Sequence, residues 1–148
     1  MEWKILITCN LDFTDVNPDW HTYLFEVPQN APKNFKKIAD IKDGRYTLWS
    51  PTGERFVAYY WVDNVGKWGI FDKDGNYEGE IFPAENKNIP IGIKVFAWSP
   101  DGKQIVYTAG TDVNELQIYI VNIDGTNNRL ITKQPSNYNW IQTYPLIQ

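Results

Sequence analysis

Three polar segments of the chain gather carboxylates, the side chains that attract cations and amines. The segments lie at 10–19, 62–66 and 110–115, and none of them contains Lys or Arg. A cluster of acids focuses the local field and can attract a cation, an amine or a basic peptide. Asp and Asn also occupy loops simply because they form Asx turns, so a purely structural role stays open. The candidate ligand-binding residues are Asp12, Asp15, Asp63, Asp112 and Glu115, with the neighbouring aromatic Trp61.

The chain has few side chains that could bind a metal ion or act as a nucleophile. A Cys/His zinc site needs about four ligands, and the chain offers only Cys9 and His21. A single cysteine also excludes an intrachain disulfide. Because no Gly-x-Ser-x-Gly elbow marks a nucleophile, we interpret His21 as solvated or loop-bonded, and Cys9 as a small buried apolar residue. We therefore predict no catalytic residue, no metal and no cofactor.

One acidic segment has part of the pattern of a calcium-binding loop. Residues 72–76 read Asp-Lys-Asp-Gly-Asn, but the spacing does not fit, and the twelfth position counted from Asp72 is Pro83. An EF-hand loop requires a bidentate Glu there. The Asp-Gly pair at 74–75 is instead typical of a tight β-hairpin, which is our prediction for this segment.

Composition narrows the classes of partner. The 148 residues carry a net charge of −4, and 16% of them are aromatic. An acidic chain of this kind makes a broad nucleic-acid groove unexpected, since that needs clustered Lys and Arg. The longest apolar run is too short to cross a bilayer, and the first residues lack the pattern of a signal peptide. We expect a cytoplasmic protein, or a periplasmic or secreted one whose signal has been removed.

The elements that would position these residues are repeated along the chain. Residues 48–57 recur as 97–106, an offset of 49 residues (97 minus 48). A third copy opens at the N-terminus, where 4–8 matches 104–108, and the same Thr-Asp-Val-Asn tetrapeptide follows both. A fixed period of this length is the signature of a repeat architecture.

Each repeat predicts short strands bounded by turn residues, and no segment has a convincing helical period. The turn Ser-Pro-Asp/Thr-Gly joins the first two strands, because Pro fixes φ at one corner and Gly accepts a positive φ at the next. The expected strands are 3–9, 22–27 and 34–40 in the first repeat, 44–50, 55–61, 67–72 and 77–82 in the second, and 93–99, 104–109, 116–123 and 128–132 in the third.

Trp-Ser-Pro-Asp-Gly-Lys, followed by an apolar strand and later an Asp-Gly turn, resembles the blade of a TolB-like, WD-repeat-like β-propeller. The resemblance covers nearly the whole chain. It implies an all-β fold of three four-stranded blades, half of a six-bladed propeller, in one domain over 1–148. The blades would be about 3–40 with 138–144, 44–82, and 93–132. Blade-structural roles are implied for Trp49, Pro51, Gly53, Trp98, Pro100, Asp101 and Gly102. The three acidic segments would then share one face around the central channel.

The ends of the repeat array predict self-association. The first repeat opens directly with its second strand, and residues 138–144 align with the first strand of the second repeat. TolB-like propellers usually have six blades, so two copies would complete a ring. We predict a homodimer in which 138–144 of one chain pairs with 3–9 of the other, so that both junctions are alike. A fragment of a longer propeller and an arc completed by another protein are the alternatives. The predicted closure residues are Trp3, Ile5, Ile7, Trp140 and Tyr144.

The leading functional prediction is a non-enzymatic module that binds a protein or peptide partner. One alternative is binding of a small ligand or carbohydrate at the acidic mouth, with Trp61 or Trp68 forming a pocket. A structural subunit of a larger assembly is a second alternative. A hydrolase or lyase that uses paired carboxylates is a third, with Asp63 and Asp112 as the nearest candidates.

Overall fold

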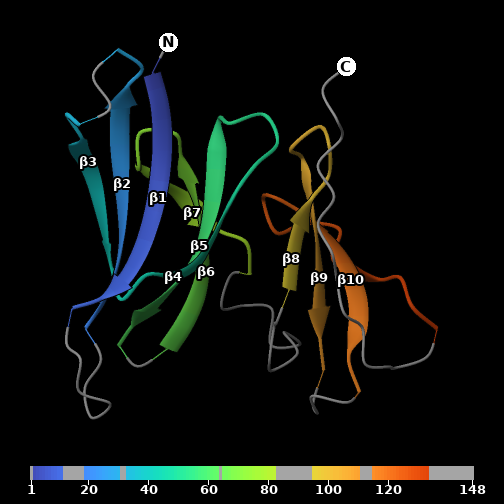
Figure 1. Cartoon of the computed structure of the whole chain (residues 1–148). Helices are drawn as coiled ribbons and strands as arrows, with labels where there is room; N and C mark the ends of the chain where they lie inside the picture. The colour runs from blue at the N-terminus through green and yellow to red at the C-terminus, as the bar shows by residue number, and fades with distance from the viewer. Residues whose placement is uncertain are drawn as a thin grey trace. The chain divides into compact units, whose positions relative to one another are not determined.

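A computed structural model describes residues 2–11, 19–30, 33–63, 65–82, 95–110 and 115–133. In this part of the chain every regular element is a β-strand, and the strands form three antiparallel sheets (Figure 1). The strands are β1 (Glu2–Asn10), β2 (Trp20–Pro28), β3 (Lys36–Lys42), β4 (Arg45–Trp49), β5 (Arg55–Val62), β6 (Val65–Asp72), β7 (Tyr77–Glu80), β8 (Val95–Trp98), β9 (Gln104–Ala109), β10 (Gln117–Asn122) and β11 (Arg129–Leu130).

The predicted all-β fold is confirmed, and most strand positions agree with the repeat alignment. Two strands differ in a way that matters for the surface. The strand expected at 34–40 is β3 and runs two residues later. The strands β5 and β6 extend toward each other, so only residues 63–64 separate them. The segment 62–66 is therefore the end of a tight hairpin rather than a five-residue loop.

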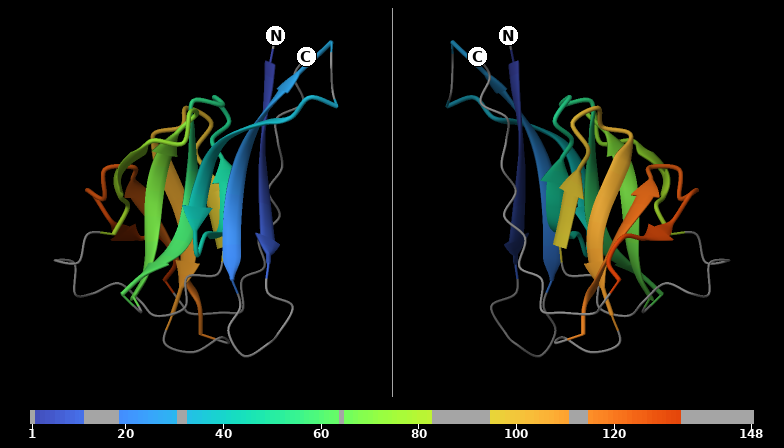
Figure 2. Two further views of the ribbon diagram at one scale, coloured as in Figure 1. Left: turned by 90° about the vertical axis from the view of Figure 1, so that its left-hand side faces the viewer. Right: turned by 90° about the vertical axis from the view of Figure 1, so that its right-hand side faces the viewer.

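The chain divides into two compact units. Unit 1 comprises Met1–Trp49 and Gly53–Glu80, and unit 2 comprises Ser50–Thr52 and Ile81–Gln148. Unit 1 holds the N-terminal sheet, in the order β1-β2-β3, and the middle sheet, in the order β4-β5-β6-β7. Figure 2 shows β2 between β1 and β3. The segment 138–144, predicted to supply a fourth strand next to β1, lies outside the described residues.

The core of unit 1 lies between its two sheets. Leu24 and Ile41 of the N-terminal sheet pack with Phe56, Ala58 and Phe71 of the middle sheet, and all five are buried. Burying one such Leu or Phe side chain contributes about 1.5–3 kcal/mol. These contacts hold the two sheets of unit 1 face to face.

Unit 2 has its own core in the C-terminal sheet, ordered β11-β10-β9-β8. Ile105, Tyr107 and Val121 are fully buried there. The Tyr107 hydroxyl donates a hydrogen bond of 3.0 Å to the Asn128 side chain, and the Phe82 ring meets the Tyr107 ring edge-on at 4.9 Å. Buried hydroxyls need such partners, so Asn128 allows an aromatic residue with a polar tip to fill this core.

Within the described residues, no helix is long and apolar enough to cross a membrane.

Candidate functional site

Four aromatic residues gather at one end of unit 1, and we call them the Tyr59 cluster. The Tyr59 ring centroid lies 6.3 Å from that of Tyr46, 5.9 Å from Trp61 and 5.2 Å from Trp68. Tyr46 is 72% exposed and Trp61 is 40% exposed, whereas Trp68 is buried. The cluster therefore has a buried base and an exposed aromatic rim.

Strand pairing explains how these rings meet. Tyr59 lies opposite Trp68 across the β5–β6 pair, and Trp61 lies two residues further along β5, on the same face. Gly66 stands opposite Trp61, and a Cβ atom placed there would lie 1.8 Å from the Tyr59 hydroxyl. Because glycine has no side chain, the Tyr59 ring can occupy the space beside Gly66.

Tyr46 reaches the cluster through an unusual backbone conformation. Its φ angle is +46°, which bulky residues rarely adopt. The pairing of β4 with β5 is irregular between Arg45 and Leu48, and a bulge of this kind redirects side chains. Strained backbone conformations cluster at active and ligand-binding sites, so the strain at Tyr46 supports a role for this end of the unit.

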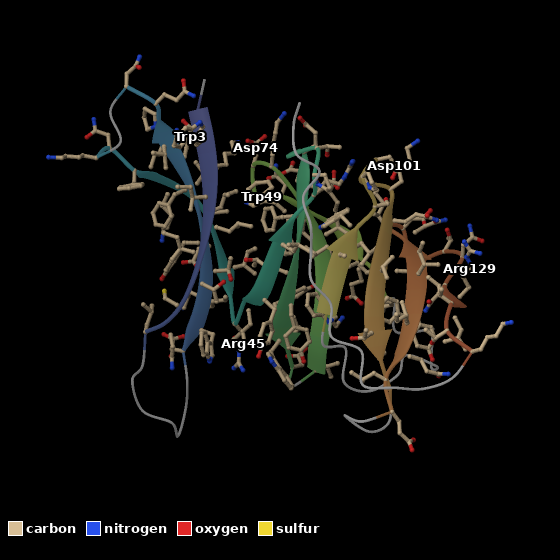
Figure 3. All side chains as sticks on the ribbon, turned by 45° about the vertical axis from the view of Figure 1, so that its right-hand side comes forward. Trp3, Arg45, Trp49, Asp74, Asp101 and Arg129 are labelled. Carbon is tan, nitrogen blue, oxygen red and sulfur yellow. The ribbon has the colours of Figure 1, made fainter. Side chains whose placement is uncertain are left out.

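Arg45 lies beside the cluster. It is the cross-strand partner of Tyr59, and its guanidinium carbon lies 5.2 Å from the centroid of the Trp20 ring. No residue in the described part of the chain accepts a hydrogen bond from its buried Nε atom. Figure 3 shows Arg45 at the end of unit 1 opposite Trp49 and Asp74.

The Tyr59 hydroxyl keeps its proton at neutral pH. Burial raises the pKa of Tyr59 above its ordinary value of 10.0, and the nearby positive charge of Arg45 opposes this only in part. The hydroxyl is thus a hydrogen-bond donor as well as an acceptor.

The structure describes two of the five predicted acidic residues and does not test their joint function. Asp63 is exposed at the tip of the β5–β6 hairpin with φ at +50°, and Glu115 is exposed in unit 2. Asp12, Asp15 and Asp112 lie outside the described residues. Among those described, no group of three His, Cys, Asp or Glu residues is placed to hold a metal ion.

The solvated alternative for His21 is wrong, whereas the loop-bonded one is confirmed in part, because Asp19 in the loop before β2 is one of its partners. His21 is buried on β2, where Nδ1 lies 2.6 Å from a carboxylate oxygen of Asp40 and Nε2 lies 3.2 Å from one of Asp19. The hydrogen bond with Asp40 is the largest cause that raises the pKa of His21 above 6.5, and burial opposes it. Since both ring nitrogens contact carboxylates, neither is free to activate a nucleophile.

Cys9 is the register partner of His21 and is half-buried rather than fully buried. It stays a small apolar strand residue in our interpretation, with the side chain on the outward face of β1.

The Asp-Gly segment after β6 is a hairpin turn. The Asp72 carboxylate accepts hydrogen bonds from the backbone amides of Asp74 and Asn76, at 2.8 and 2.9 Å, and Gly75 has φ at +86°. The turn's own donors therefore occupy the Asp72 carboxylate. Burial acts to raise the pKa of Asp72, but hydrogen bonds from the Asn76 side chain and from the turn's backbone amides together lower it.

Three residues with predicted blade-structural roles lie in or next to the β4–β5 turn. Trp49 is half-buried, packs against the core of unit 1, and meets the Phe56 ring at 5.1 Å. Pro51 and Gly53 are exposed in the turn, and Gly53 has φ at +70°.

The other four lie in or next to the β8–β9 turn of unit 2. Trp98 and Gly102 are buried, and Pro100 and Asp101 are exposed. The Asp101 carboxylate accepts hydrogen bonds from the Ser99 hydroxyl at 2.6 Å and from the backbone amide of Lys103 at 3.1 Å. These contacts fix the turn; the contribution of the seven residues to blade packing stays a prediction.

A hollow of about 350 Å³ lies in unit 1, lined by Lys4, Trp49, Gly53 and Lys73. Lys4 donates a hydrogen bond of 3.0 Å to the Lys73 carbonyl and forms an ion pair with Asp74. The Lys73 ammonium is paired with Glu54 at 3.0 Å. Because these cations already have partners, the hollow is better explained as a junction between β1 and the β6–β7 turn than as an anion site.

Sequence reasoning named Trp61 and Trp68 but missed Tyr59, Tyr46 and Arg45. The alternation of Tyr59 and Trp61 on one strand was a usable signal, since residues two apart share a face. The pairing of Arg45 with Tyr59 could not be predicted from the sequence, because it depends on the irregular register between β4 and β5.

Comparisons with solved structures place these sheets in a known fold. A protein of Agrobacterium tumefaciens described as a TolB superposes with a TM-score of 0.59 and 20% identity, over 88% of this chain and 43% of that chain. The β-propeller domain of the trilobed protease of Pyrococcus furiosus, described as having an open velcro topology, gives 0.55 and 12% identity, over 89% of this chain and 40% of that chain.

No protein-family model and no curated protein sequence matches the chain. The chain spans less than half the length of the two solved structures. At these identities the likeness concerns the fold alone. The chain has the fold of a TolB-like β-propeller, as its repeated Trp-Ser-Pro turns predict.

Proposed function

We propose that this chain is a non-enzymatic module that binds a protein or peptide, and that the Tyr59 cluster is its contact surface. The observation that carries the proposal is the exposed aromatic rim of Tyr46 and Trp61 on a buried base. Trp, Tyr and Arg dominate the binding energy of protein interfaces, because they bury much apolar area and keep a polar group. The proposal does not depend on the compartment, for which our expectation stays as stated from the sequence.

The chemistry of the cluster defines the kind of partner. The aromatic faces suit an apolar or aromatic side chain, and the Tyr59 hydroxyl can donate a hydrogen bond. The half-buried guanidinium of Arg45 carries a positive charge that suits a carbonyl or carboxylate oxygen beside that side chain. We therefore infer a peptide segment that carries a large apolar residue next to an exposed acceptor.

Selection from a random peptide library displayed on phage tests the proposal. We expect binders whose affinity falls about tenfold or more in Trp61→Ala and in Tyr46→Ala, the range expected for a central aromatic contact. The matched control is Leu130→Ala, which removes an exposed apolar side chain in unit 2 and should leave the affinity unchanged. A failure to select any peptide, or equal losses in all three variants, would contradict the proposal.

Exposed aromatic faces also favour a second candidate, the binding of a carbohydrate. A sugar ring stacks on a flat aromatic surface, and Trp61 presents such a surface at the hairpin tip. A glycan array separates the two functions. Binding to glycans that Trp61→Ala abolishes, without any peptide binder, would support the carbohydrate candidate and replace the first proposal.

A further inference from the structure

Three rings of the Tyr59 cluster are open to a ligand. Tyr46 and Trp61 are exposed, and Tyr59, which contacts both of them, is half-buried. The Tyr59 ring centroid lies 6.3 Å from that of Tyr46 and 5.9 Å from that of Trp61. The rings are inclined to one another, at 52° and 82°, rather than stacked face to face. The cluster therefore presents separate aromatic surfaces at nearly equal intervals.

The interval between these rings equals the repeat of one kind of extended peptide. A chain in the polyproline II conformation rises about 3.1 Å per residue, so residues two apart lie about 6 Å apart along its axis. With about three residues per turn, side chains at i and i+2 lie on adjoining edges of the helix and can face one surface together. Alternate side chains of such a peptide can thus meet successive rings of the cluster.

The cluster also supplies hydrogen-bond donors. The Tyr59 hydroxyl keeps its proton, because burial raises its pKa above 10.0. The Trp61 indole is a donor only, and the half-buried guanidinium of Arg45 lies beside the cluster. A polyproline II segment has no internal hydrogen bonds, and its proline residues have no N–H. Its free carbonyl groups are therefore the acceptors that these donors require.

Two other peptide conformations fit the cluster less well. A helical ligand also spaces side chains about 5–6 Å apart, but its backbone carbonyl groups are already hydrogen-bonded within the helix. An added β-strand needs an open strand edge. Tyr59 is on β5, an inner strand of the sheet, with Arg45 of β4 on one side and Trp68 of β6 on the other. The surface is therefore read through side chains.

The charge next to the cluster excludes a further class of ligand. Aromatic faces attract ammonium groups, including methylated lysine. The positive charge of Arg45 lies close enough to Tyr59 to act on the pKa of its hydroxyl. The same charge repels a bound cation and favours the oxygen atoms of a neutral or acidic segment.

We propose that the Tyr59 cluster binds a proline-rich segment in the polyproline II conformation. This inference rests on the binding function proposed above and narrows its partner. Alternate apolar side chains of the segment contact Tyr46, Tyr59 and Trp61, and one of its carbonyl groups accepts a hydrogen bond from the Tyr59 hydroxyl. Proline fixes the ligand backbone before binding, so less conformational entropy is lost on a surface with few contacts.

Two fluorescein-labelled peptides test the proposal in the whole chain, with fluorescence anisotropy as the readout. The first is (Leu-Pro)4, in which proline and the restriction on the residue before it favour an extended backbone throughout. The second is (Leu-Gly)4, which keeps the leucines on a flexible backbone. We expect (Leu-Pro)4 to bind about tenfold or more tightly than (Leu-Gly)4, because each glycine must be ordered on binding.

Two variants locate the site. Trp61→Ala should weaken (Leu-Pro)4 binding about tenfold or more. Tyr59→Phe keeps the ring and removes the hydroxyl, so it should weaken binding about two- to tenfold, the contribution of one hydrogen bond. Tyr77→Phe is the matched control and should change nothing. Tyr77 is an exposed tyrosine that contacts Tyr60 and Phe71 instead of the cluster.

The outcomes separate this inference from the proposed function. Equal affinity for the two peptides, lost in Trp61→Ala, would overturn the polyproline II assignment and leave peptide binding in place. Selected phage peptides that depend on Trp61 but lack proline would do the same. If (Leu-Pro)4 does not bind and no phage peptide is selected, both proposals fail. Binding of (Leu-Pro)4 that is unchanged in Trp61→Ala or in Tyr59→Phe would also overturn the inference.

Discussion

The pair formed by His21 and Asp40 shows how a single contact can make stability depend on pH. The hydrogen bond with Asp40 raises the pKa of His21 above its ordinary 6.5. Burial pushes the pKa of Asp40 up, but the hydrogen bond and charge of His21 outweigh it, and that pKa lies below 3.8. The contribution of His21 to the free energy of unfolding is complete below pH 6.5. It is lost as the pH rises through the folded pKa of His21. The contribution of Asp40 is present above pH 3.8 and is lost as the pH falls through its own folded pKa.

We therefore expect His21→Gln to cost most stability between these limits. Its free energy of unfolding should fall by about 1.5 kcal/mol at pH 5.5, where hydrogen bonds to charged groups contribute about 1.5–3 kcal/mol. Partial exposure of Asp40 screens the pair and keeps the effect at the lower end. At pH 8.5 the loss should be smaller, because the neutral imidazole gains less from the carboxylate. Urea titrations at both values measure this, and equal losses would show that packing alone explains the effect.

The outcome for His21 also shows where sequence interpretation reaches its limit. The turn residues and the strand that carries His21 follow from the repeat. Its partner Asp40 does not, because the approach depends on where β3 begins and on the irregular pairing between Leu24 and Phe25. A shift of two residues in β3 relative to the expected 34–40 moves its side chains along β2, and no local pattern specifies that shift.

At the level of elements, the sequence repeat is clearest in the turns between strands. Gly53, Gly75 and Gly102 all have positive φ, and each stands in a turn that its Asp-Gly or Pro-x-Gly sequence predicts. The strands between them are rich in β-branched and aromatic residues, as β5 and β6 show. The length of the β5–β6 hairpin was less predictable. Val62 pairs with Val65 although both side chains are exposed, so their burial does not distinguish a strand from a loop.

Two glycine turns that look alike in sequence should respond differently to the same substitution. Gly53 and Gly75 have φ of +70° and +86°, so an alanine is strained at both, at about 1–2 kcal/mol. A Cβ at Gly53 meets nothing within 4 Å, whereas one at Gly75 would lie 2.3 Å from the Ala39 Cβ. We expect Gly75→Ala to lower the free energy of unfolding by about 1–3 kcal/mol more than Gly53→Ala does, because β3 must also move.

Denaturant unfolding of the two variants measures the difference, and Ala39→Gly provides the check. In the Gly75→Ala background, Ala39→Gly should restore part of the lost stability, whereas in the wild type it should cost about 0.5–1 kcal/mol. If the two alanine variants proved equally stable, the contact between the β6–β7 turn and β3 would not contribute to holding the sheets of unit 1 together.

On the scale of the whole molecule, two exposed apolar surfaces of unit 1 have different origins. The Tyr59 cluster lies at the end of strands, where hairpins can vary without disturbing the core. It depends on the positive φ of Tyr46 and on the absence of a side chain at Gly66. The exposed residues Trp3, Ile5 and Ile7 of β1 need only regular strand pairing, because residues two apart on a strand share a face. A change of register at β4 would therefore disperse the Tyr59 cluster, whereas the row on β1 would remain.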